Sequence, residues 1–260
     1  MFSENPFATL SSSIPSTLMQ AYLLLMIAFV VGGTLFDMLH KRNAAYFFQH
    51  RRKTRAQAQR EVSGGEKALL AAKTLAEALV SGEFCNPRRR IAHLLAMYGF
   101  TAYAITTVIM VFWYSAPDIT TPTILPLLWH LGALLILIGG IWFWFFLRVD
   151  VAAEGHSPLR VVHADLFIVA LLKSAALALT WSWLQSKDSP LAMWAFGVYL
   201  IATMVLFASV PWSKFSHMFY KPAAAFQRRL EKARGSRMNL PLPEKTPEVL
   251  GSVRDLPRHY

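Results

Sequence analysis

The chain has 260 residues, of which 55% are hydrophobic and 16% are charged, and its mean hydropathy is positive. This composition excludes an ordinary soluble domain and indicates an integral membrane protein. The formal net charge is +11, but the basic residues are concentrated in alternate segments, which favours a membrane topology signal over binding to nucleic acid. The single cysteine, Cys85, excludes an intramolecular disulfide and an iron–sulfur cluster held by cysteines of this chain.

Five apolar runs are each long enough to cross about 30 Å of hydrocarbon as a helix. They lie at about 18–39, 91–113, 125–147, 163–184 and 191–212. Twelve Lys and Arg residues fall in segment 40–90, two in 148–162 and ten from residue 213 onward. By the positive-inside rule, the sequence predicts an all-α bundle of five transmembrane helices, with the N-terminus outside and the C-terminus in the cytoplasm.

Three parts follow from this topology. Residues 1–17 form a periplasmic N-terminus without Lys or Arg, so no cleaved signal peptide is expected. Residues 18–222 form the membrane domain, which includes a cytoplasmic loop at 40–90. Residues 223–260 form a basic, proline-containing cytoplasmic tail.

The cytoplasmic loop carries two amphipathic features. An aromatic and basic stretch, Tyr46 to Lys53, suits a chain lying on anionic headgroups. Ser63 and Glu66 then have the spacing of a capping box before an Ala/Leu-rich run, which predicts an amphipathic helix at about 65–80. This helix either rests on the bilayer or docks a soluble partner.

Two histidines are expected near the cytoplasmic face on antiparallel spans. His93 follows an arginine triplet and opens the second run, and His217 closes the last run within the stretch 211–222. Two neutral imidazoles on facing helices can hold a haem b iron between them, so both residues are candidate axial ligands. The alternative is that both are interfacial polar residues. His130 begins the third run at the outer side, too far away to complete this pair.

Lys173 lies ten residues into the fourth run, about 15 Å along a helix. An ionisable residue at this depth is a candidate functional residue; the alternative is a lysine that snorkels or bonds a neighbouring carbonyl.

The segments around the two histidines resemble a known family. His93 followed by Met97-Tyr98-Gly99-Phe100, and the closing stretch from Pro211 to Tyr220, are similar to the respiratory nitrate reductase gamma subunit family and to the membrane cytochrome b of the quinone-interacting oxidoreductase of sulfate reducers. The segments 46–48, 81–93 and 148–155 resemble, more narrowly, the membrane anchors of adenylylsulfate reductase in sulfur-oxidising bacteria.

This resemblance implies a pattern of haem ligands. In the broader family two b haems are held by two histidines on span two and two on span five. The inner pair corresponds to His93 and His217, whereas the outer positions carry Tyr103 and Tyr199. The resemblance therefore implies at most one haem b, near the cytoplasm.

The implied function is a membrane anchor and electron-transfer subunit of the bacterial cytoplasmic (inner) membrane, non-catalytic or quinone-reducing. Its partners are a cytoplasmic flavoprotein and iron–sulfur protein, namely an adenylylsulfate reductase that oxidises sulfite with AMP, together with quinone and the lipid bilayer. Lys173, and with less support Tyr103 or Tyr199, is expected to donate a hydrogen bond or proton to the quinone. A haem-free anchor that only docks the soluble enzyme is the alternative, and a transporter is disfavoured because no inverted repeat is evident.

Overall fold

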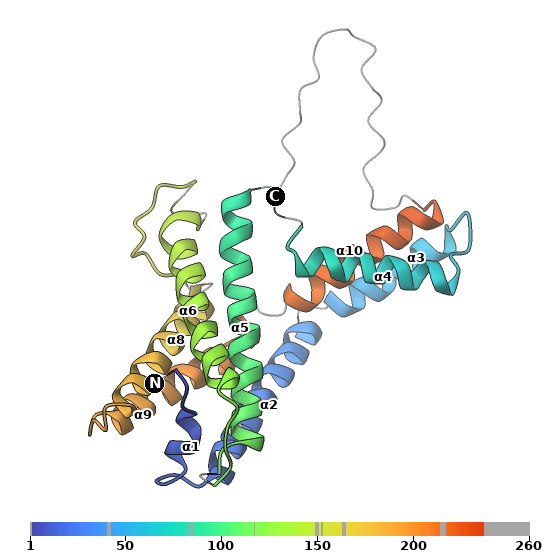
Figure 1. Cartoon of the computed structure of the whole chain (residues 1–260). Coiled ribbons are helices and arrows are strands. Elements are labelled where there is room, and N and C mark those ends of the chain that lie inside the picture. The colour runs from blue at the N-terminus through green and yellow to red at the C-terminus, as the bar shows by residue number, and fades with distance from the viewer. Residues whose placement is uncertain are drawn as a thin grey trace.

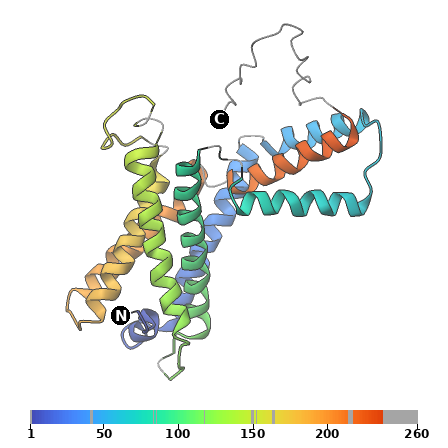
Figure 2. The same cartoon turned by 45° about the horizontal axis from the view of Figure 1, so that its top comes forward.

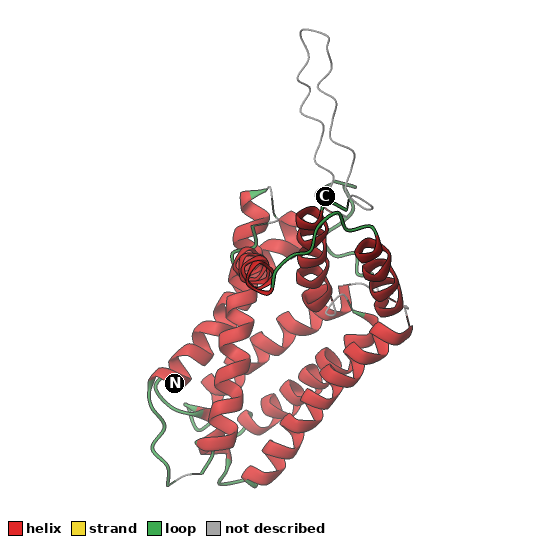
Figure 3. Cartoon of the chain, turned by 90° about the vertical axis from the view of Figure 1, so that its right-hand side faces the viewer, coloured by secondary structure: helices red, strands yellow, loops and turns green. Residues whose placement is uncertain are grey.

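The computed structural model describes residues 2–40, 43–82, 84, 86–116, 118–148, 151, 153–162, 165–213 and 217–236, except the side chains of 43–46, 217 and 219. Every regular element within these ranges is a helix, as Figure 3 shows. The predicted all-α class is therefore confirmed for the part of the chain that the structure describes.

The bundle consists of long helices that alternate in direction (Figure 1). They are α2 (Ser16–His40), α5 (Pro87–Trp113), α6 (Ile124–Trp142), α8 (Leu166–Gln185) and α9 (Ala192–Ala208). A π-helical turn, η1 (Phe143–Leu147), continues α6. Four of these helices are long and apolar enough to cross a membrane, where α6 is counted together with η1. This indicates a multi-pass membrane protein. The fifth, α9, is apolar but has 17 residues.

The end of α9 differs from the expected span 191–212. The helix stops at Ala208, and the chain continues in a 3-10 turn, η3 (Val210–Trp212). Pro211 has no backbone N–H and cannot continue the ladder of helical hydrogen bonds. It packs against α2 at Gly33, where an added Cβ would lie 2.9 Å from the Pro211 Cδ.

Helices α5 and α6 approach each other through glycines. A Cβ added at Gly132 would lie 2.7 Å from the Gly99 carbonyl oxygen, and one added at Gly139 would lie 2.6 Å from that of Ala92. Small residues of this kind let membrane helices pack backbone against backbone. This contact fixes where His93 and Tyr103 lie relative to α6.

Three further helices form a platform: α3 (Asn43–Ala56), α4 (Gly64–Leu79) and α10 (His217–Arg234). Figures 1 and 2 show the platform projecting sideways from the end of the bundle opposite the short helix α1 (Pro6–Leu10). Helix α10 packs against both α3 and α4. The amphipathic helix expected at 65–80 corresponds to α4, and α10 runs through residues 222–223, where the sequence placed the start of the tail.

Polar side chains hold the platform together. His50 Nε2 on α3 lies 2.9 Å from Glu231 Oε1 on α10, and Gln227 Nε2 donates to Thr54 Oγ1 at 3.2 Å. At the surface, Arg60 pairs with Glu66, which raises the pKa of the guanidinium through their hydrogen bond. The contacts of Glu231 and Gln227 fix the register of α10 against α3.

Candidate functional site

His93 lies in the second turn of α5 and contacts the segment that precedes this helix. Asn86 caps the helix by accepting from the Arg88 N–H at 2.9 Å, and Pro87 occupies the first helical position. The chain between α4 and α5 folds over the imidazole. Ser81 Oγ lies 2.8 Å from His93 Nδ1, and the Phe84 ring centroid lies 5.0 Å from that of His93.

Ser81 has a backbone conformation that non-glycine residues rarely adopt. Its φ is +49°, just after the end of α4, where glycine is usual. The residue is 2% exposed. Backbone strain of this kind persists where the surroundings hold the residue in place, and it is often associated with function. Here it directs the Ser81 hydroxyl at the imidazole.

The hydrogen bond to Ser81 matters for metal ligation. When Nδ1 carries the proton and donates to Ser81 Oγ, the Nε2 atom of His93 carries the lone pair that a haem iron requires. Hydrogen bonding of the distal ring nitrogen is the usual way in which proteins orient a ligating histidine. The role of His93 as an axial ligand stays a prediction, and the contact with Ser81 is compatible with it.

The start of α10 lies close to this segment. The Lys221 Nζ is 5.6 Å from the centroid of the Phe84 ring, which also contacts His93. Lys221 follows His217, the first residue of α10, by four residues, and so lies one helical turn beyond it. The side chain of His217 lies outside the described residues. The structure thus brings the beginning of α10 to the His93 segment and leaves the orientation of the second imidazole as a prediction.

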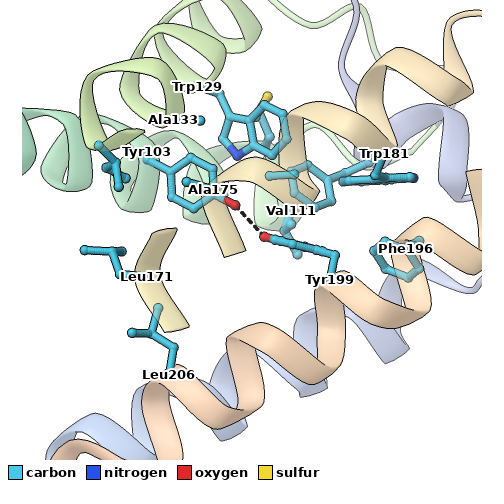
Figure 4. Close-up of a cluster of buried hydrophobic side chains, with 14 of the residues drawn as sticks. Tyr103, Val111, Trp129, Ala133, Leu171, Ala175, Trp181, Phe196, Tyr199 and Leu206 are labelled. Carbon is cyan, nitrogen blue, oxygen red and sulfur yellow. Dashed lines mark hydrogen bonds between the residues drawn. The ribbon is translucent and has the colours of Figure 1, made fainter. Parts of the chain in front are cut away.

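Tyr103 and Tyr199 face each other across the bundle. The hydroxyl groups of Tyr103 on α5 and Tyr199 on α9 are 2.7 Å apart, and Figure 4 shows this bond within the buried aromatic cluster. Tyr103 stacks on Trp129 and Tyr199 on Trp181. The space between α5 and α9 at this level is filled by the two rings themselves.

A third tyrosine extends the polar contacts next to this pair. The Tyr22 hydroxyl lies 2.7 Å from the Leu200 carbonyl oxygen and 2.7 Å from Thr203 Oγ1. Thr203 Oγ1 in turn donates to the Tyr199 carbonyl oxygen at 3.0 Å. Hydrogen bonds of hydroxyl groups therefore connect α2 to α9 within an otherwise apolar core.

Lys173 is placed elsewhere. It is exposed on α8, whereas the next two residues, Ser174 and Ala175, are buried against the rest of the bundle. Because Tyr103 and Tyr199 belong to the buried core, the structure does not bring Lys173 together with them. The predicted quinone pocket is thereby divided into a buried tyrosine pair and a lysine on the outer surface of the bundle.

Comparison with known proteins gives one match. The family model for citrate utilization protein B (CitB) matches residues 6–237. The chain belongs to this family. No curated protein and no solved structure matches it. The match extends over both the bundle and the platform, so these parts together make up the CitB unit.

One ionic site of this CitB-family chain was missed by sequence reasoning. Arg148, at the end of η1, pairs with Asp165 before α8 at 2.6 Å and lies 4.0 Å from the centroid of the Trp144 ring. Its guanidinium also donates to the carbonyl oxygens of Pro158 and Arg160. The charged block 148–155 is evident in the sequence, but the pairing spans 17 residues and no local pattern predicts it.

The other histidines whose side chains the structure describes have structural partners. His130 is fully buried, with Nδ1 2.6 Å from the Pro126 carbonyl oxygen and Nε2 2.7 Å from Ser182 Oγ. His40 is exposed and stacks on Phe36. Among the described residues, no group of three or more His, Cys, Asp or Glu side chains could hold a metal ion.

Proposed function

We propose that the chain is the membrane subunit of an electron-transfer complex, which passes electrons between a soluble flavin/iron–sulfur oxidoreductase in the cytoplasm and the quinone pool. In this proposal five helices cross the bacterial cytoplasmic membrane, with α9 and η3 together forming the last span. The N-terminus lies outside and the platform lies in the cytoplasm. The basic residues of α3 and of the first turn of α5 lie at the platform end of the bundle, which supports this orientation.

One haem b is proposed near the cytoplasmic end, held by His93 and His217. The observation that supports it is the Ser81–His93 hydrogen bond, because Ser81 Oγ can accept a proton from His93 Nδ1 and so leave Nε2 as the ligating atom. Haem b held by two imidazoles exchanges one electron at a time. Ser81 orients the ring, Phe84 covers it, and Lys221 with the arginines before His93 supplies positive charge suited to haem carboxylates.

Quinone reduction consumes two electrons and two protons and yields quinol. We propose Lys173 as the residue that donates a hydrogen bond to a quinone oxygen, since its exposed position on α8 is accessible from the lipid. The Tyr103 and Tyr199 hydroxyls bond to each other in the core, and their proposed role is to fill the position at which the resembling family holds its outer haem.

The haem is tested by the reduced-minus-oxidised absorption spectrum of protein purified from haem-replete cells. A b-type alpha band is expected in the wild type, and its loss is expected in His93→Ala and His217→Ala. His156→Ala is the matched control, because His156 is exposed in the loop between η1 and α8. An intact chain without any b-type band would contradict the proposal and favour the haem-free anchor.

The soluble partner is tested by co-purification from native membranes. The resemblance favours adenylylsulfate reductase, whereas the family name points to a setting in citrate utilization. Recovery of a stoichiometric flavoprotein with an iron–sulfur protein supports the electron-transfer role, and the substrate of that flavoprotein distinguishes the two settings. Recovery of the chain without any redox partner would count against both.

A further inference from the structure

Helix α4 exposes a continuous apolar face. Leu69 is 70% exposed, Leu75 58% and Leu79 49%, and the alanines on the same side of the helix are also exposed. These alanines are Ala68, Ala72 and Ala76. Such a face is costly in water, so it indicates a surface that is covered in the working protein.

The opposite side of α4 is already engaged by the platform. Arg229 on α10 donates to Thr74 Oγ1 at 2.6 Å and pairs with Glu77. Thr74 is 4% exposed. These contacts set the rotation of α4 about its axis, so its apolar side faces away from α10.

Two hydrogen bonds set the depth of α4 relative to the membrane helices. The Tyr98 hydroxyl donates to the Leu79 carbonyl oxygen at 2.9 Å, and Arg90 Nε donates to the Val80 carbonyl oxygen at 2.9 Å. Tyr98 lies seven residues beyond Ile91, about 10 Å further along α5, and its side chain reaches back by about one turn. The end of α4 is therefore level with the first turns of the apolar part of α5, where Ile91 and Tyr98 are themselves 47% exposed.

The charges around this face suit an anionic surface. Both glutamates of α4 are paired with arginines, Glu66 with Arg60 and Glu77 with Arg229. Lys67 and Lys73 are exposed on the same helix. Pairing neutralises the acidic groups and leaves the lysines to set the sign of the local potential, which attracts anionic headgroups.

We infer that α4 is an in-plane membrane helix, seated in the leaflet at the platform end of the bundle. Its apolar face lies at the boundary between headgroups and acyl chains, and Lys67 and Lys73 contact the phosphates of anionic phospholipids. The depth fixed by Tyr98 and Arg90 favours lipid over a soluble protein, because a helix at the level of the membrane-embedded turns of α5 borders the bilayer. The inference is independent of haem binding.

The test measures depth with spin labels on the full chain. Single cysteines are introduced at Ala72 and Leu75, on the apolar face, in a Cys85→Ser background; Glu61→Cys, at an exposed position in the connection between α3 and α4, is the control. Each protein is reconstituted into nanodiscs of phosphatidylcholine, with or without phosphatidylglycerol. Collision rates with oxygen and with a water-soluble nickel chelate are then compared.

At least a fivefold higher ratio of oxygen to nickel accessibility is expected at Ala72→Cys and Leu75→Cys than at Glu61→Cys. Phosphatidylglycerol should increase this difference, and the increase should disappear when Lys67 and Lys73 are both replaced by Gln in the Leu75→Cys protein. Equal nickel accessibility at all three sites would overturn the inference. It would also be overturned, in favour of protein docking, if Leu75→Cys became protected from nickel only after the soluble partner was added. Equal accessibilities with and without phosphatidylglycerol would overturn the role of the lysines.

Discussion

The membrane bundle and the platform of α3, α4 and α10 are held together by opposite kinds of contact. The bundle core consists of interlocked aromatic, aliphatic and small residues, with glycines where α5 meets α6. The platform buries Glu231 and Gln227 in a hydrogen-bonded network. Lipid supplies no hydrophobic drive between helices, so the bundle depends on close packing, whereas the platform uses polar groups to select one register of α10.

The largest expected effect breaks the close packing of the bundle. Gly132→Ala should destabilise the protein by about 3 kcal/mol, at the upper end of overpacking costs, because the new Cβ would lie 2.7 Å from the Gly99 carbonyl oxygen. The temperature at which half of the protein remains monodisperse in detergent measures this change. Gly32→Ala is the control, since a Cβ there has no neighbour within 4 Å. Equal behaviour of the two variants would show that α5 and α6 are not in backbone contact.

An intermediate effect is expected in the platform. Glu231→Ala should cost about 2 kcal/mol, because it removes the partner of His50 and of Gln227 inside the network. Hydrogen exchange should become faster in α10 and α3 while α5 and α6 are unchanged. The exposed Glu61→Ala is the control and should leave exchange as in the wild type. Faster exchange throughout the bundle would contradict the separation of the two regions.

The smallest effect tests whether polar contacts also matter in the bundle. Tyr103→Phe leaves the Tyr199 hydroxyl buried without this partner and should cost about 1 kcal/mol. The double variant with Tyr199→Phe should cost less than the sum of the two single variants, since neither hydroxyl then lacks the other. Thermal unfolding of the four proteins in detergent gives the coupling energy. Strict additivity would contradict the hydrogen bond between the two hydroxyls.

The membrane helices could be predicted from hydropathy because lipid demands long apolar segments whatever the tertiary structure. The end of the last helix could not be predicted from hydropathy, because residues 191–212 are apolar almost throughout. The signal for the end of this helix is Pro211, which lacks a backbone N–H, and hydropathy does not register it. The short helix α1 had a local signal, Asn5 as cap followed by Pro6, within a segment that hydropathy does not single out.

The other features that the sequence did not predict are contacts between residues far apart in the chain. The positions of Tyr103 and Tyr199 were identified through a family resemblance, but their mutual hydrogen bond depends on how α5 and α9 pack. Similarly, the Ser81–His93 contact requires the chain between α4 and α5 to fold back, which spacing alone does not indicate. The depth of Lys173 follows from its position in the run, whereas the side of α8 on which it lies depends on the neighbours of that helix.

The end of α10 imposes an order on biosynthesis. Its terminal carbonyl, that of Arg234, accepts from the backbone N–H groups of Gln59 and Arg60, which lie in the connection between α3 and α4. A ribosome makes α3 and α4 before α5, and it makes α10 only after α9 has emerged. The platform therefore closes last, so its closure marks a chain whose membrane segments have all been synthesised.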